Sequence, residues 1–278
     1  LPEADCTAEA PRLTISVTRL EQLSPALLEL GCPARVYIPL EEVSRLESLP
    51  GEGPEWCAVL PRVWRDRDEP ALRTLLERAR ALGFTGVLIG NLGHLPLVRG
   101  LNFHLYGDYG LNVFNSRSLA YLKDKELESA CVSFELRFAQ IRDLKKVLRA
   151  EAIVYGRLPL MITENCLVQN ETGCRLDRQG PCVPEDGPCR CGQPNVLVDR
   201  TGAAFPLLPA YGHRTEIQNS KPLYLADRPE HRRLGLAYAR LRFTTETAEE
   251  CVSVVQNYLD AAPAAGDFTR GLYERGVE

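Results

Sequence analysis

"WCAVLPRVWRDRDEPALRTLLERARALGFTGVLIG" (residues 56–90) contains a strand pattern, a helix pattern and a second strand pattern in turn. In its middle, apolar residues recur every three or four positions, Pro70 lies in the first turn, and Gly83 follows the last periodic residue. Proline at the start and glycine after the end are typical helix boundaries. The flanking runs at 56–60 and 86–90 are short and apolar, as strands are. We therefore expect a strand, a helix and a strand that pack as one unit.

The same alternation continues in both directions along the chain. Six further strands are predicted, at 13–17, 34–38, 103–107, 131–136, 152–156 and 239–244. Helices are predicted at "SRSLAYLKD" (116–124), "AQIRDLKKVLR" (139–149) and "TAEECVSVVQNYLDA" (247–261). Eight strands alternating with helices predict an α/β fold of the (β/α)8 TIM-barrel type, in which functional groups follow the carboxyl ends of the strands. An open, doubly wound sheet is the alternative.

The alternation fails once, between the seventh and eighth strands. Residues 157–235 form a longer connection than one helix needs, and we interpret them as a Cys-rich insertion followed by a hairpin. The hairpin is predicted at "NVLVDRTGAAFPLL" (195–208), with its turn at Thr201 and Gly202. The barrel domain is thus expected to span 13–260. Residues 1–12 would form an N-terminal tail, and residues 261–278 a C-terminal tail leading to a missing segment of a longer chain.

Composition narrows the class of protein. The chain has 278 residues, 45% of them hydrophobic, and 33 basic against 37 acidic residues give a formal charge of -4. No overall basic field therefore attracts nucleic acid, although a local basic face is compatible with these counts. The sequence has no apolar run of the ~20 residues that a membrane span needs, and its start lacks signal-peptide features. We expect a cytoplasmic protein with no membrane partner; the sequence leaves its oligomeric state open.

Nine of the ten cysteines fall into two groups, and the tenth, Cys6, lies in the predicted N-terminal tail and is given no role. Those in or beside apolar runs are expected to pack in the core: Cys32, Cys57, Cys131 and Cys251. Five others share one Gly- and Pro-rich stretch: Cys166, Cys174, Cys182, Cys189 and Cys191. Such a backbone can turn several thiols toward one point, which favours an iron-sulfur cluster, with zinc or disulfides as alternatives. Four ligands suffice for a cluster or a zinc ion, so the fifth thiol is spare unless His213 replaces two of them; a lone histidine in such a run is more often a loop residue than a ligand.

Polar residues at the predicted strand ends are the other candidates. Glu135 and Glu164 are the predicted catalytic carboxylates. Further candidates at such ends are Asp108, Asn112, Asn115, Arg157 and Arg242. The competing interpretation is that these residues cap helices and form ion pairs, as Asn115 would for the helix at 116–124. His94 is expected on the surface or on a helix face. We find no Walker A, G-x-S-x-G or H-E-x-x-H motif.

Several runs resemble one known family. They are "VYGRLPLMITENC", the "GC" at 173–174, "LVDRTGAAFPL", "EIQNSKPLYLADR" and "FTRGLYERGVE", together with "GDYGLNVFNSRSL" and "SFELRFAQIRDL". They resemble peptidase family U32, the collagenase-like peptidases, and most closely the second U32-like region of its long bacterial members. The resemblance extends from about residue 13 over nearly the whole chain.

The resemblance implies a barrel-like fold and two possible activities. The family is named for proteolysis, yet some members resemble iron-sulfur proteins that hydroxylate RNA bases or quinone precursors. On that resemblance Cys166 and Cys174 would bind a cluster, of the 4Fe-4S type, with Cys191 as a third ligand. This chain departs from the pattern in its extra thiols at Cys182 and Cys189, so the fourth ligand stays open.

Three functional hypotheses follow. The first is oxidative hydroxylation of RNA or of a small aromatic substrate by a U32 domain with a cysteine-ligated cluster. The second is hydrolysis of a peptide substrate, with zinc polarising the scissile carbonyl. The third is a non-catalytic scaffold domain that a metal or disulfides hold together, acting with other domains of a longer chain.

Overall fold

The computed structural model describes residues 10–172, 190 and 193–277. These residues divide into two compact units. The barrel unit comprises the described residues up to Gly156 and those from Leu223 onward, and the inserted unit is Arg157–Pro222.

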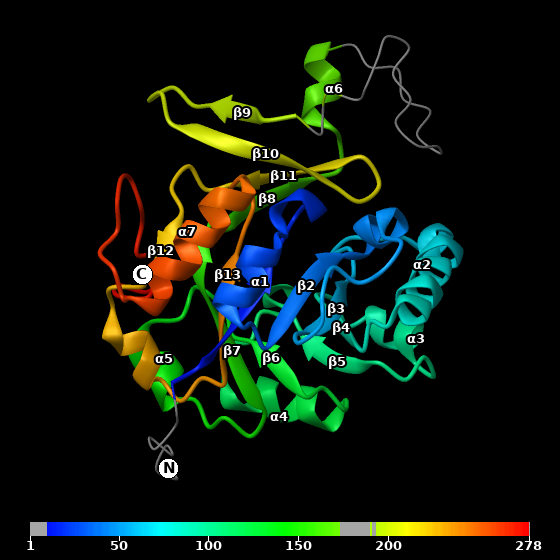
Figure 1. Ribbon diagram of the computed structural model, residues 1–278, viewed down its shortest axis with the longest axis horizontal. Helices are drawn as coiled ribbons and strands as arrows, with labels where there is room; N and C mark the ends of the chain where they lie inside the picture. The colour runs from blue at the N-terminus through cyan, green and yellow to red at the C-terminus, as the bar shows by residue number, and fades with distance from the viewer. Residues whose placement is uncertain (1–9, 173–189, 191–192, 278) are drawn as a thin grey trace. The chain divides into compact units, whose positions relative to one another are not determined.

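In the described part of the barrel unit, eight parallel strands close into a ring (Figure 1). In ring order they are β1 (Arg12–Ser16), β2 (Arg35–Pro39), β3 (Glu55–Val59), β4 (Gly86–Ile89), β5 (His104–Gly107), β6 (Ser129–Cys131), β7 (Arg149–Gly156) and β13 (Tyr238–Arg242). The ring closes because β13 pairs with β1, Leu241 opposite Ile15. A short strand, β12 (Leu223–Tyr224), adds to β7 in the antiparallel sense, outside the ring. The predicted (β/α)8 barrel is confirmed.

Helices lie between the strands, as the periodicity predicts. They are α1 (Pro25–Gly31), α2 (Glu69–Leu82), α3 (His94–Val98), α4 (Ser116–Asp124), α5 (Phe138–Asp143) and α7 (Ala248–Leu259). In α2 the side chains of Leu72, Leu76 and Ala79 are fully buried, and Gly83 ends the helix with φ +99. Burying each leucine stabilises the fold by about 1.5–3 kcal/mol. The apolar stripe of the opening sequence is therefore the face that the helix buries.

Two predicted elements end early. The strand predicted at 131–136 shares only Cys131 with β6 (Ser129–Cys131), because a turn follows in which Leu136 donates to the carbonyl of Ser133. The helix predicted at 139–149 stops at Asp143. The later apolar residues of the predicted helix, Leu144 and Leu148, lie in a loop and are nevertheless buried. Arg149 already belongs to β7 and pairs with β6. In both cases burial satisfies the apolar pattern without the regular element.

The junction of the two units lies at the end of β7. Gly156 has φ +118, and a Cβ there would lie 2.0 Å from the carbonyl oxygen of Arg242. Only glycine tolerates that approach and that backbone conformation.

Near the C-terminal end of the described residues, Tyr273 is buried and its hydroxyl donates to the Ile153 carbonyl at 2.6 Å. Residues around Tyr273 therefore pack on the barrel.

The inserted unit is built on a small antiparallel sheet. Its strands run in the order β8 (Pro159–Thr163), β11 (Arg214–Gln218), β10 (Ala204–Ala210) and β9 (Asn195–Val198), and α6 (Leu167–Thr172) follows β8. The predicted hairpin is confirmed, because Ala204 pairs with Val198. In its turn, Asp199 Oδ1 accepts hydrogen bonds from the backbone N–H groups of Thr201 and Ala203.

Two side chains differ in exposure from what the sequence predicts. His94 is the first residue of α3, as the helix alternative predicts, but it is fully buried rather than on the surface, because its ring packs on Trp64 and its Nε2 lies 3.1 Å from the Pro61 carbonyl. Cys32 is exposed rather than in the core, because it ends α1 in the left-handed conformation, φ 34. The core placement of Cys57, Cys131 and Cys251 is confirmed. The described part of the chain contains no helix with the length and apolarity of a membrane span.

Candidate functional site

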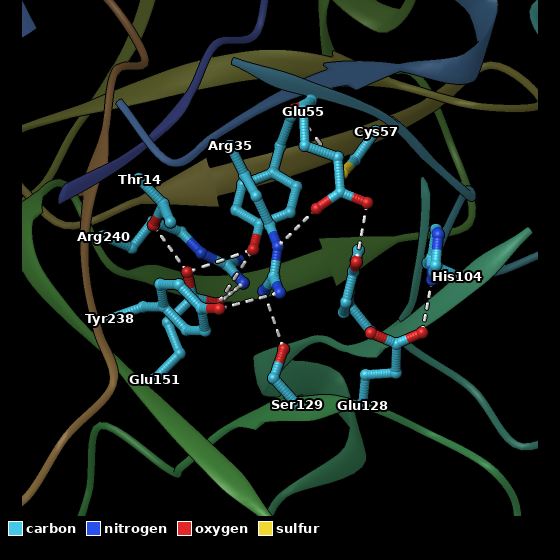
Figure 2. Close-up of polar contacts among 12 residues, drawn as sticks. Thr14, Arg35, Glu55, Cys57, His104, Glu128, Ser129, Glu151, Tyr238 and Arg240 are labelled. Carbon is cyan, nitrogen blue, oxygen red and sulfur yellow. Dashed lines mark hydrogen bonds and ion pairs between the residues drawn. The ribbon is translucent and has the colours of Figure 1, made fainter. Parts of the chain in front are cut away.

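The barrel encloses a network of buried charged and polar side chains that come from several strands of the ring (Figure 2). Alternation along β13 places Arg240 on the same strand face as Tyr238 and Arg242. Arg240 is 1% exposed and forms ion pairs with Glu151 of β7 and with Asp108, which follows β5. One guanidinium therefore joins two strands of the ring and the segment that follows a third. A buried arginine of this kind requires both carboxylates, since an unpaired buried charge is costly.

Glu151 is held from two further strands. It accepts hydrogen bonds from Thr14 Oγ1 of β1 at 2.5 Å and from the Tyr37 hydroxyl of β2 at 3.1 Å. Burial raises the pKa of Tyr37, and the Glu151 carboxylate raises it further. The Tyr37 hydroxyl thus stays protonated and donates. All of these partners lie on strands of the ring, so the Glu151 carboxylate is a structural centre of the barrel.

A second charged layer lies toward the amino ends of the strands. Arg35, the first residue of β2, donates to Glu55 at 3.0 Å, to Ser129 at 2.8 Å and to the Tyr238 hydroxyl at 3.1 Å. Its guanidinium also lies 3.6 Å from the centre of the Tyr106 ring. Figure 2 shows these side chains converging from different strands. This layer closes the end of the barrel opposite to the one where such folds bind substrates.

The carboxyl ends of the strands carry the groups suited to binding. Asp108 uses Oδ1 for Arg240, and its Oδ2 has no hydrogen bond within the described residues. The next residue, Tyr109, has the guanidinium of Arg62 at 5.6 Å and that of Arg242 at 5.8 Å from its ring centre, with the Phe134 ring at 5.8 Å. We call Asp108, Tyr109, Arg62 and Arg242 the barrel mouth. It combines a fixed carboxylate, two cations and an aromatic ring at the end where barrel enzymes act.

The predicted strand-end residues are distributed over both units. Glu135 is half-buried in the loop after β6, and its N–H donates to Ser133 Oγ at 3.3 Å. Asn115 caps α4 by accepting from the Ser118 N–H at 3.0 Å, as its competing interpretation predicts. Asn112 is exposed and ends a short 3-10 turn with φ 50. Arg157 belongs to the inserted unit and donates to the Asn219 carbonyl at 3.0 Å.

Glu164 and Cys166 lie in the inserted unit, between β8 and α6. The side chain of Glu164 is 58% exposed and accepts from Arg214 Nη2 at 3.0 Å. Cys166 is a free, buried thiol. Because Glu135 belongs to the barrel unit and Glu164 to the inserted unit, neither unit contains both predicted catalytic carboxylates.

The other predicted metal ligands fall outside the described residues. These are Cys174, Cys182, Cys189 and Cys191. His213 is described and lies just before β11, with φ 60. Among the residues that the structure describes, no group of three His, Cys, Asp or Glu is placed to hold a metal. Since four of the five cysteines are not among them, the metal-site prediction stays a prediction.

The buried network was not predicted from the sequence, although a signal for it exists. Arg240 and Arg242 alternate with Ala239 and Leu241 in "YARLR", and Glu151 is the one charged residue in the buried part of β7. In a closed barrel, the side chains that alternate with those facing the helices point inward. Charged residues at period two in a barrel strand therefore indicate an interior ion-pair network.

Comparison with known proteins points to one family. The family model for peptidase family U32 matches residues 49–195. Among solved structures, the U32 peptidase Mk0906 has 9% identity and a TM-score of 0.47, covering 89% of this chain and 98% of its own. A thiamine phosphate pyrophosphorylase from Pyrococcus furiosus has 8% identity and a TM-score of 0.39, covering 90% and 96%. Structural similarity this low carries no argument about activity, and the curated proteins gave no match.

Proposed function

Because the chain belongs to peptidase family U32, we propose that it is an enzyme domain that binds an iron-sulfur cluster through cysteines of its inserted unit. In this proposal the domain takes part in oxidative hydroxylation of RNA or of a small aromatic substrate. One observation carries the proposal: Cys166 is a free thiol, 7% exposed, directly before α6. It is the first of five cysteines within a short stretch of sequence.

Cys166 fits the requirements of a cluster ligand. Cysteine thiolates are the usual ligands of iron-sulfur clusters, and burial with hydrogen bonding around the sulfur sets the reduction potential. Cys174 is the second proposed ligand, and two of Cys182, Cys189 and Cys191 would complete the set. A bound cluster of the 4Fe-4S type would supply electron transfer. A reducing compartment such as the cytoplasm would keep these thiols free to bind it.

The barrel mouth is the proposed place for substrate binding. Asp108 is held in one orientation by Arg240, and its second oxygen can accept a hydrogen bond from a substrate hydroxyl or amine. Glu135, in the loop after β6, is proposed to move a proton at the same end of the barrel. Both assignments concern the barrel unit alone.

Peptide hydrolysis is the second candidate, and the family model favours it by name. The cysteines would then hold zinc, which polarises a carbonyl. A closed set of four thiolates leaves no coordination position for water, so it suits structural zinc better than catalytic zinc. For this reason hydroxylation is our first proposal.

The direct test is a comparison of cells with and without the full-length protein. RNA nucleosides and small aromatic metabolites are measured by mass spectrometry in a deletion strain and after complementation. We expect one hydroxylated product to be absent from the deletion strain and its precursor, with one oxygen atom fewer, to accumulate. Complementation with the wild type or with Cys32→Ser should restore the product, and complementation with Cys166→Ser should not. Restoration by Cys166→Ser would contradict the proposal. Gelatin cleavage by full-length protein that persists in Cys166→Ser would favour a peptidase that does not use this site.

A further inference from the structure

The backbone on both sides of Cys166 is tied to one residue of a distant strand. Thr215 in β11 is 3% exposed, and its Oγ1 accepts a hydrogen bond from the Leu167 N–H at 3.0 Å. Its carbonyl accepts from Thr163 Oγ1 at 3.3 Å. Thr163 Oγ1 also lies within 2.6 Å of the Asn165 carbonyl. The segment 163–167 is thus fastened before and after the cysteine.

The bond to Leu167 has a specific physical role. Leu167 is the first residue of α6, and the first N–H groups of a helix have no partner within the helix. In most helices a side chain just before the helix accepts from such a group. Here the acceptor comes from Thr215, 48 residues further along the chain. Tertiary structure, rather than local sequence, therefore decides where α6 begins and where Cys166 lies.

A second tie starts from the residue before Thr215. The side chain of Arg214 is 4% exposed and donates from Nη2 to Glu164 at 3.0 Å. From Nη1 it donates to the Tyr211 carbonyl at 3.0 Å. This charge-assisted pair links the residue two positions before Cys166 to the same end of β11. Both ties therefore restrain the same short segment.

We propose that Thr215, supported by the Arg214–Glu164 ion pair, is a positioning residue that fixes Cys166 before any metal binds. A thiol held in place in advance loses less conformational entropy when a metal site assembles around it. Residues that hydrogen-bond to metal ligands and orient them are known to raise metal affinity for this reason. The positioning itself is a property of the polypeptide, and only its consequence for metal binding rests on the proposed function.

The first experiment uses the full chain without metal. Amide hydrogen exchange at Leu167 and alkylation of Cys166 by iodoacetamide are measured in Thr215→Val, which keeps the shape of the side chain but removes the acceptor. Loss of one hydrogen bond should speed both reactions by about tenfold. Thr215→Ser, which keeps the hydroxyl, should behave as wild type. Thr201→Val is the matched control, because the Thr201 hydroxyl bonds within the exposed hairpin turn of the same unit.

The second experiment adds iron and sulfide anaerobically to the same proteins. Thr215→Val should bind iron about 10- to 100-fold more weakly than wild type, with Thr215→Ser close to wild type. Unchanged exchange at Leu167 together with unchanged alkylation of Cys166 in Thr215→Val would overturn the positioning role. A wild-type protein that binds no metal would instead contradict the proposed function, and the exchange and alkylation rates would still decide the role of Thr215.

Discussion

The barrel interior and the inserted unit use charge in opposite ways. In the barrel, Arg240 and Glu151 are each 1% exposed, and Glu151 also bonds to Thr14, 137 residues away in sequence. In the inserted unit, Arg214 is buried but its partner Glu164 is 58% exposed. The sheet of the inserted unit also exposes Leu160, Met161 and Val198 by 55–60%. The barrel interior thus encloses a charged network, whereas the inserted unit exposes the Glu164 carboxylate and several apolar side chains.

This difference indicates where each unit obtains its stability. The barrel closes on itself and buries a large apolar layer between strands and helices. A four-stranded sheet with exposed apolar side chains has few comparable contacts. Small structures with few such contacts often depend on a metal or on disulfides. We therefore expect the barrel to be stable alone, and the inserted unit to gain further stability from the metal that we propose its cysteines bind.

The largest effect should come from Arg240→Met. The change leaves Asp108 and Glu151 buried without their shared counter-charge, and we expect the free energy of unfolding to fall by about 3–5 kcal/mol. Denaturant unfolding at neutral pH measures it. Arg73→Met is the control, since Arg73 forms an ion pair with Glu69 in which both side chains are 40% exposed. Similar losses in the two variants would show that the interior network has no special role.

The next effect concerns pH and His94. Burial lowers the pKa of His94 to about 4 from its ordinary 6.5. Between these values the unfolded chain binds a proton that the folded chain does not, so stability falls as pH decreases from 6.5 toward 4. The loss attributable to His94 at pH 5 is about 2 kcal/mol.

Unfolding at pH 7 and pH 5 in wild type and His94→Gln tests this prediction. The variant should lose less stability between the two pH values. Burial also lowers the pKa of His231, so a smaller slope of the same sign should remain. Equal slopes in wild type and His94→Gln would contradict the assignment.

Metal removal should affect the inserted unit alone. We expect a chelator to raise amide exchange in β8, β9, β10 and β11 by about tenfold or more, with no change in β1 to β5, because metal binding is coupled to local folding. Mass spectrometry of the loaded and stripped protein measures both sets of strands together. Uniform loosening of both units would show that they are not stabilised separately.

The smallest effect is a pattern of thiol reactivity in the folded barrel. Cys32 is exposed and should be alkylated under native conditions. Burial raises the pKa of Cys57 and Cys131, and raises that of Cys251 to about 12, so these three should react only after unfolding. Native labelling of Cys57 or Cys131 would mean that the barrel core opens.

The sequence predicts the strands and helices of the barrel better than it predicts the residues of the candidate site. The apolar runs of the strands and the apolar stripe of α2 must be buried in any fold. The spacing of apolar residues along the sequence is therefore enough to predict these elements. The sequence analysis did not identify Arg240, Glu151 and Thr14 as a network, because the partners of each lie far away in sequence. The burial of His94 and the exposure of Cys32 were missed for a related reason, since the turn into α3 and the left-handed end of α1 decide which way these side chains point. The role of Thr215 likewise follows from one long-range contact.

The measurement that tests the account most directly is the iron and sulfide content, with a visible absorption spectrum, of full-length protein purified without oxygen. Wild type, Cys166→Ser and Cys32→Ser are compared. We predict iron and sulfide in wild type and in Cys32→Ser, and their loss in Cys166→Ser. One equivalent of zinc or no metal in the wild type, or iron that Cys166→Ser retains in full, would contradict the account.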